Sequence, residues 1–236
     1  MTVLLLRLAG PLQSWGSSAR FVRRTTENAP TKSGVIGLLA AAQGRDRDAD
    51  VSDLVRLRYG VRIDQAGTPV RDFQTAHHQD SDKAMPLSER FYLADAVFVA
   101  GLEGDSALVR ALHDAVRKPV YLPYLGRRSC PPSAPLDLGV REDVGLLDAL
   151  RQAPWQASEW YQRTLGARSP LRLSVLFDCP PDESPELTLR DEPISFDLRH
   201  RRYALRGLKS AQVPVPGSAG TQEPPVHDPT SVLGPA

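Results

Sequence analysis

The stretch VLLLRL, residues 3–8, decides how the fold begins, together with TKSGVIGLLAAA, residues 31–42, which follows it after a long loop. The first stretch is apolar apart from Arg7, so it is too short for the core of a signal peptide and suits a buried strand. Thr31 or Ser33 can cap a helix through the second stretch. The chain therefore begins with a strand, a loop and a helix.

The rest of the first half alternates helices and strands. A short helix, two strands and an amphipathic helix are predicted in turn at residues 52–58, 61–63, 96–100 and 105–118. With a later strand to complete it, this order predicts an α+β fold of ferredoxin-like type. Residues 70–92 are polar and irregular, and they predict an excursion from the domain.

The second half predicts one helix and several extended segments. The helix is expected near residues 142–151, and extended segments at residues 171–177, 187–189 and 194–198. These strands complete the first sheet or build a second one. We expect one domain over residues 1–211, and a disordered tail over residues 212–236, because its Pro-, Gly- and Ser-rich sequence has too few apolar groups to offset the entropy of ordering.

Bulk composition narrows the function classes. The 236 residues carry 29 Lys and Arg against 28 Asp and Glu, so any nucleic-acid site must be a local patch. Cys130 and Cys179 are far apart and lack metal-ligand spacing, and no apolar run approaches the length of a membrane span. We expect a soluble, reduced, cytoplasmic protein that has no membrane contact.

Residues 12–24 combine aromatic rings, guanidinium groups and hydroxyls in one loop. The residues of interest are Trp15, Arg20, Phe21, Arg23 and Arg24. Arginine can pair with phosphate through two hydrogen bonds, and aromatic rings can stack on unpaired bases, so the loop suits RNA. The alternative is that both aromatic rings anchor the loop to the core while the arginines are solvated.

A second basic segment spans residues 117–131 and holds four cations and no acid: Arg117, Lys118, Arg127 and Arg128. Pro123 and Gly126 bracket a tight turn that carries Tyr124, so the last two arginines would project from a constrained loop. The alternative is a solvated basic loop. Cys130 has no His nearby in sequence to activate it, which favours a small buried side chain over a nucleophile.

Catalytic signals are weak in this sequence. His77 and His78 are adjacent, so on a strand they would point to opposite faces and could not easily serve one site. There is no phosphate-binding Gly-Lys-Ser/Thr loop, no zinc spacing and no convincing carboxylate cluster. We therefore expect a protein without catalytic residues, metal or cofactor.

Three stretches in this order and spacing resemble the CasD family of type I-E CRISPR Cascade subunits, within the repeat-associated RNA-binding superfamily. They are RLAGPLQSWG, PTKSGVIGLL and YLGRRSCP, at residues 7–16, 30–39 and 124–131. The resemblance covers roughly residues 1–210, and RDFQT at residues 71–75 is a weaker match.

The resemblance implies a ferredoxin-like (RRM-like) palm with a projecting β-hairpin thumb at about residues 70–92 and additional C-terminal strands. It implies a non-catalytic subunit in antiviral defence that binds the 5′ handle of the crRNA and caps the end of the Cascade backbone. The implied partners are crRNA, the backbone subunit and the large subunit, with target DNA reached only through the complex.

Residue by residue, the resemblance assigns the RNA contacts. Nine residues would line the handle: Trp15, Arg20, Arg23, Arg24, Lys32, Ser33, Tyr124, Arg127 and Arg128. Arg71, Phe73 and Gln74 would act from the thumb. The chief alternative is a metal-independent endoribonuclease that processes repeat RNA, and a third is a protein adaptor without RNA contact, which would leave both arginine-rich loops unexplained.

Overall fold

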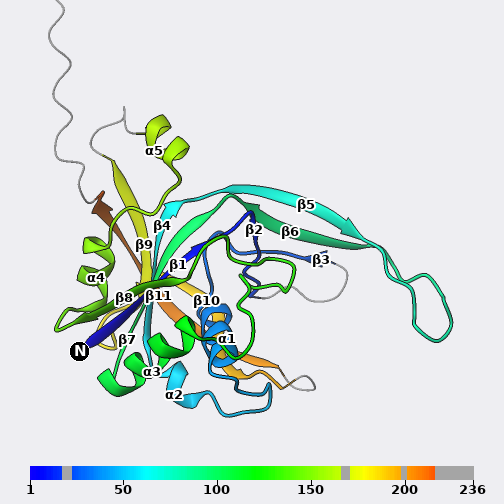
Figure 1. Ribbon diagram of the computed structural model, residues 1–236, viewed down its shortest axis with the longest axis horizontal. Helices are drawn as coiled ribbons and strands as arrows, with labels where there is room; N and C mark the ends of the chain where they lie inside the picture. The colour runs from blue at the N-terminus through cyan, green and yellow to red at the C-terminus, as the bar shows by residue number, and fades with distance from the viewer. Residues whose placement is uncertain (18–22, 166–170, 198–200, 216–236) are drawn as a thin grey trace, which may run out of the picture.

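The computed structural model describes residues 1–17, 23–165, 171–197 and 201–215 (Figure 1). Its main feature is an antiparallel sheet in the order β10-β11-β9-β4-β7-β1-β8. The strands are β1 (Thr2–Ala9), β4 (Arg58–Gln65), β7 (Val97–Gly104), β8 (Asp137–Glu142), β9 (Arg172–Asp178), β10 (Leu187–Ser195) and β11 (Arg202–Pro214).

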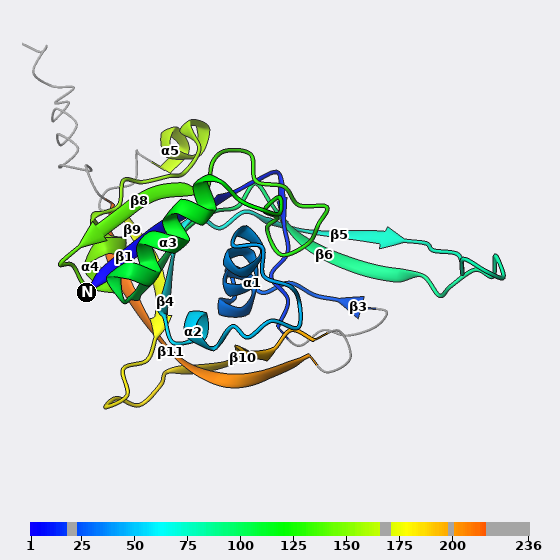
Figure 2. The same cartoon turned by 60° about the horizontal axis from the view of Figure 1, so that its bottom comes forward.

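A second, smaller sheet lies beside the first. It consists of β2 (Leu12–Gln13), β3 (Arg23–Arg24), β5 (Thr68–Gln74) and β6 (Ser88–Ala94), and β6 pairs with all three others. Strands β5 and β6 form a hairpin that extends away from the rest of the molecule in both views (Figures 1 and 2). The predicted excursion at residues 70–92 is therefore an ordered β-hairpin at its base.

Helices cover both faces of the main sheet. They are α1 (Lys32–Ala42), α2 (Ser52–Val55), α3 (Ser106–Arg117), α4 (Leu146–Gln152) and α5 (Glu159–Leu165). Leu4 and Leu6 of β1 join the core that contains α1 and α3, whereas Val3 and Leu5 join the core that contains α4. Because β1 is buried on both faces, its sequence is a continuous apolar run instead of an alternating one.

The helix caps agree with the sequence-based expectation. The side chain of Thr31 accepts a hydrogen bond from the Gly34 amide at the start of α1, and Asp105 accepts from the Ala107 and Leu108 amides at the start of α3. These contacts satisfy amides that have no partner within the helix. None of the helices in the described ranges is both long enough and apolar enough to cross a membrane.

The structure corrects several predicted boundaries. The helix expected from residue 142 begins at Leu146, and Glu142 ends β8, which pairs with β1. The helix expected over residues 52–58 ends at Val55. Strand β11 was not predicted at all, and its residues 212–214, assigned to a disordered tail, pair with β9. Residues 216–236 lie outside the described residues.

The open question about the second half is settled by strand pairing. Strands β9, β11 and β10 extend the main sheet alongside β4 and do not form a separate sheet. Strands β9 and β10 also contribute carboxylates that contact the start of α1. The N-terminal and C-terminal halves of the chain therefore share one sheet.

Candidate nucleic-acid interface

The two loops that the sequence singled out lie against each other. The backbone amide of Ser14 donates to the carbonyl oxygen of Leu125 (3.1 Å), and the Ser14 hydroxyl donates to the carbonyl oxygen of Phe91 on β6 (3.0 Å). Gly126 has φ +83°, and a Cβ atom there would overlap the Ser14 carbonyl. The first loop, the second loop and the hairpin therefore meet at one place.

Trp15 lies beneath this junction and is fully buried. Its Nε1 donates to Oε1 of Gln13 (3.1 Å), and the Gln13 amide in turn donates to the carbonyl oxygens of Leu8 and Ala96. Its ring also packs against Gly34 of α1. The expectation that Trp15 lines a bound RNA is wrong for this structure, and the alternative that it anchors the loop to the core is supported.

Lys32 and Ser33 are likewise buried at the start of α1. The Lys32 ammonium lies 3.2 Å from Asp178 and 3.8 Å from Glu192, and its backbone amide donates to Asp191 (2.8 Å). The Ser33 hydroxyl donates to the Thr31 hydroxyl. Lys32 fixes the helix to the C-terminal strands, and Ser33 is buried within the helix cap, so the expectation that they face RNA is also corrected.

Strand pairing separates the arginines of the hairpin onto two faces. Arg24 of β3 is paired with Arg90 of β6, and Arg90 is paired with Asp72 of β5. Residues that are directly opposite point to the same side of a sheet, and the next residues point to the other side. Arg24 and Arg90 therefore share one face, which also carries Tyr92.

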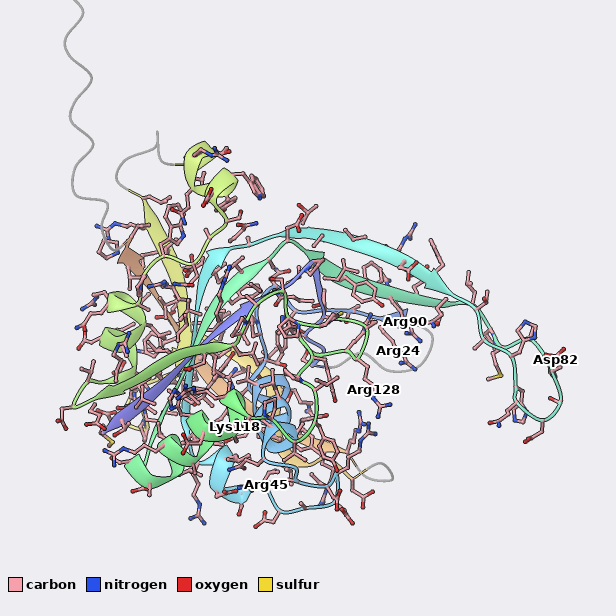
Figure 3. All side chains as sticks on the ribbon, in the orientation of Figure 1. Arg24, Arg45, Asp82, Arg90, Lys118 and Arg128 are labelled. Atoms are coloured by element: carbon pink, nitrogen blue, oxygen red, sulfur yellow. The ribbon has the colours of Figure 1, made fainter. Side chains whose placement is uncertain are left out.

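The loop at residues 124–130 adds two more cations to that face. The Arg127 guanidinium lies 4.7 Å from the centre of the Tyr92 ring, and its Nη2 donates to the carbonyl oxygen of Arg24 (2.8 Å). Arg128 follows Arg127 directly, and in the view of Figure 3 it lies near Arg24 and Arg90, close to the base of the hairpin. We call Arg24, Arg90, Arg127 and Arg128 the arginine face.

Two nitrogens of the arginine face lack acceptors. Nε of Arg90 and Nη1 of Arg127 are buried and have no hydrogen-bond partner among the described residues. A buried donor without a partner costs about 1–3 kcal/mol. Phosphate oxygens are strong acceptors for guanidinium groups, and the side chains of this face that are exposed to such a ligand are Arg24 and Arg128.

The opposite face of the hairpin differs in chemistry. Arg23 lies 5.2 Å from the Phe91 ring centre, Arg71 lies 4.9 Å from the Phe73 ring centre, and both arginines approach Glu89. Their charges are thus already partnered. Phe73 is half exposed, and Gln74 is exposed on the same side as Asp72. The predicted thumb residues are therefore divided between the two faces.

The loop that carries Arg127 and Arg128 is a tight turn, as expected. The Leu125 amide donates to the Cys130 carbonyl oxygen (2.7 Å), and the Cys130 amide donates back to the Arg127 carbonyl oxygen (2.9 Å). Tyr124 is half-buried beside them. Burial raises the pKa of the Cys130 thiol, which agrees with a packing role and disfavours a nucleophilic one.

The remaining expectations concern residues away from this face. Arg20 lies outside the described residues. His77 lies at the tip of the hairpin, 3.2 Å from Asp82, and Figure 3 shows that Asp82 is far from Arg24 and Arg90. Sequence reasoning missed Arg90. The alternation of Ser88, Arg90 and Tyr92 in a strand puts it on the same face as Tyr92, but its position beside the basic loop depends on contacts between distant segments.

The amino-acid sequence of this chain is similar to known proteins. The family model described as CRISPR-associated protein (Cas_Cas5) matches residues 3–208. The chain is 40% identical over 157 residues to the CRISPR system Cascade subunit CasD of Escherichia coli (strain K12), covering 58% of this chain and 70% of that protein.

Two solved structures are also similar. A crystal structure of a Cas protein shares 39% identity and a TM-score of 0.71, covering 91% of this chain and 97% of that one. A chain of a CRISPR RNA-guided surveillance complex shares 30% identity and a TM-score of 0.73, covering 92% of each.

Proposed function

The chain belongs to the Cas5 family of CRISPR-associated proteins, and from that premise we propose that it is the non-catalytic Cascade subunit that binds the 5′ handle of the crRNA. The similarity to CasD confirms the resemblance that three sequence stretches predicted. Within a type I-E complex, the protein would cap one end of the backbone and contact the backbone subunit and the large subunit. Its role would be in antiviral defence.

The observation that carries this proposal is the arginine face. Its four guanidinium groups come from β3, β6 and one loop, and two buried N–H groups among them lack acceptors within the described residues. A phosphodiester backbone offers several acceptor oxygens in succession, and proteins grip single-stranded RNA through such contacts. A protein adaptor without RNA contact would leave the gathering of four guanidinium groups on one face unexplained.

The topology supports a palm-and-thumb organisation. The elements β1, α1, β4, β7, α3 and β8 follow one another in the chain, and their strands lie in the order β4-β7-β1-β8. That is the order of a ferredoxin-like fold, which we take as the palm. The β5–β6 hairpin would be the thumb, and β9, β10 and β11 the additional C-terminal strands.

Within this proposal, the residues have distinct roles. The arginine face would bind phosphates, and half-buried Tyr124 would stack on a base of the handle. Arg71, Phe73 and Gln74 would contact RNA from the thumb, and Arg20 and Arg23 would act from the first loop. Trp15, Lys32 and Ser33 would act indirectly, because they hold the loop and α1 in place.

The endoribonuclease alternative finds less support. A metal-independent ribonuclease needs an acid and a base close to the 2′-hydroxyl. His77 and His78 lie in the distal part of the hairpin, away from the arginine face. His113 lies on α3, where its ring contacts Asp137 of β8 (3.0 Å). None of the three histidines among the described residues lies at the face that would hold RNA, and His200 and His227 lie outside those residues.

The test removes charge from the arginine face. The double substitution Arg127→Ala plus Arg128→Ala should weaken binding of the cognate handle RNA by about 1–3 kcal/mol for each guanidinium that pairs with the RNA in the wild type. The slope of log affinity against log salt should fall by about 0.7 for each phosphate that is no longer neutralised. Arg90→Ala should act in the same direction. Fluorescence anisotropy of labelled handle RNA at several salt concentrations measures both quantities.

Arg151→Ala is the matched control, since Arg151 is an exposed arginine on α4, at the other face of the sheet, where it pairs with Asp148. Its affinity and salt slope should equal those of the wild type. Unchanged affinity and slope in the double variant would refute the assignment of the arginine face. A defined cut in the RNA would favour the endoribonuclease instead.

A further inference from the structure

Three consecutive large apolar residues are exposed directly after α3. Val120, Tyr121 and Leu122 are 66%, 50% and 87% exposed, respectively. Single exposed apolar residues are common on protein surfaces, but a contiguous exposed group usually marks an interaction site. We call these three residues the apolar ridge. The ridge belongs neither to the core nor to the arginine face.

The ridge is held in place by the rest of the protein. The Val120 amide donates to the Ala42 carbonyl oxygen (3.0 Å), and the Tyr121 amide donates to the Ala41 carbonyl oxygen (3.3 Å), both at the end of α1. The Val120 side chain packs over Gly44, where an added Cβ would come within 3.0 Å of it. The ridge is therefore exposed on a segment whose backbone is fixed to the end of α1.

A pocket of about 330 Å³ lies beside the ridge. Pro119 and Pro123, which flank the ridge, both line it, and Pro132 and Pro135 line it from the following segment. Proline rings lose little conformational entropy when they are covered, so such a pocket can bind a partner at low entropic cost. Its lining is suited to an apolar side chain.

Positive charge borders the pocket on one side. Asp137 and exposed Arg117 both line the pocket and lie 3.6 Å apart, so the charge of Arg117 is already paired. Lys118 is exposed, and among the residues that the structure describes, no carboxylate lies within ion-pair distance of its ammonium group. A partner that carries acidic side chains next to an apolar one would complement this edge.

We propose that the apolar ridge and the proline-lined pocket are a docking surface for another protein subunit of the same assembly. The occupant is a segment that inserts an apolar side chain into the pocket and places an acidic side chain against Lys118. This inference rests on the proposed function only in that the chain works as part of a complex. RNA is less suited, because the ridge offers apolar groups where a phosphodiester needs donors.

The docking surface and the arginine face can be tested separately. Leu122 and Arg128 lie in the same segment, but buried Leu125 and the turn around Gly126 stand between them. Substitutions in the ridge should therefore leave RNA binding unchanged. This separation distinguishes failure of the docking proposal from failure of the RNA-binding proposal.

The experiment titrates the full chain with each of the other purified subunits of its cognate complex, one at a time and without RNA. Tyr121→Ser plus Leu122→Ser should weaken the affinity for one subunit by about tenfold or more. The reason is that a few large side chains near the centre of an interface carry most of the binding energy. Lys118→Glu should weaken the same interaction and reduce its dependence on salt. Handle RNA affinity should stay at the wild-type value for both variants.

Leu187→Ser is the matched control, because Leu187 is 55% exposed on β10, at the other edge of the sheet. It should leave every subunit affinity unchanged, and thermal unfolding should show that all variants are folded. Unchanged affinity of the ridge variant for every subunit overturns the proposal. Loss of RNA affinity would assign the ridge to RNA, and loss only of self-association would assign it to a second copy, and either result also overturns it.

Discussion

Gly126 is the residue on which the arginine face depends most directly. Its φ of +83° lies in the left-handed region, and a side chain there would overlap the Ser14 carbonyl oxygen. The two loops can approach each other only because this position has no Cβ. Arg127 and Arg128 follow immediately, so their direction is set by that contact.

Gly126→Ala is therefore expected to lower the free energy of unfolding by about 1–3 kcal/mol, because it adds both backbone strain and a steric overlap. Handle affinity should fall with it, since the arginine loop must move. Urea denaturation and RNA titration measure the two effects.

Gly145→Ala is the control, because no atom lies within 4 Å of a Cβ at that position and its φ is −75°. Because Gly145 is the N-cap of α4, where Ala is less favourable than Gly, the free energy of unfolding of this variant should fall by no more than about 1 kcal/mol, less than that of Gly126→Ala. Equal stability of the two variants would show that the loops tolerate separation.

Burial explains why some residues of the sequence motifs have structural roles. Trp15 and Lys32 belong to stretches that match the family, yet both side chains are buried and hydrogen-bonded or ion-paired. A sequence motif can therefore include buried residues that hold a site in place as well as the exposed residues that form it. Arg90 shows the converse, because it faces the site from a strand that carries no strong family signal.

The β5–β6 hairpin is the element that the protein extends farthest from its core (Figure 1). Tyr92 and Leu93 at its base are buried, whereas residues 75–87 are exposed throughout. Stability should therefore come from the base of the hairpin alone. The distal part is free to serve a partner or RNA.

Replacing residues 76–86 with a short Asn-Gly turn should change the free energy of unfolding by no more than about 0.5 kcal/mol, since no buried group is removed. Circular dichroism during thermal unfolding measures this. Handle binding through the arginine face should persist, because Arg90 and Tyr92 remain in β6. A large loss of stability would indicate that the distal part packs elsewhere in the protein.

Across the whole molecule, a buried charge network joins the two halves of the chain. Arg206 of β11 pairs with Asp178 of β9 (2.6 Å) and Asp191 of β10 (2.7 Å), and these carboxylates also bind Lys32 of α1. Burial opposes the charge of Arg206, but hydrogen bonds and the nearby negative charges outweigh it and raise its pKa. The guanidinium is thus held charged.

Arg206→Met should lower the free energy of unfolding by about 3–5 kcal/mol, because it leaves Asp178 and Asp191 with too little positive charge in a buried place. Arg110→Met removes an exposed ion pair with Glu142 and should have little effect. Urea denaturation of both variants compares them. A small effect of Arg206→Met would mean that Lys32 alone balances the two carboxylates.

Local patterns in the amino-acid sequence were sufficient to predict some elements of this structure. The apolar run of β1, the caps at Thr31 and Asp105, and the tight turn at Gly126 depend on neighbours within a few residues. Periodicity and side-chain chemistry act over that range, so these elements could be predicted. The order of the three family-like stretches likewise needed no coordinates.

Which residues meet depends on pairing between segments that are distant in the chain. Strands β8 and β11 are stabilised by such distant partners, and β3 is placed by pairing with β6, so their local sequences carried little signal. The same pairing brings Arg24 and Arg90 to Arg127 and turns Trp15 inward. Which side chains are buried and which arginines lie together could therefore be seen only in the folded protein. A linear sequence pattern does not contain the distances between segments that are far apart in the chain.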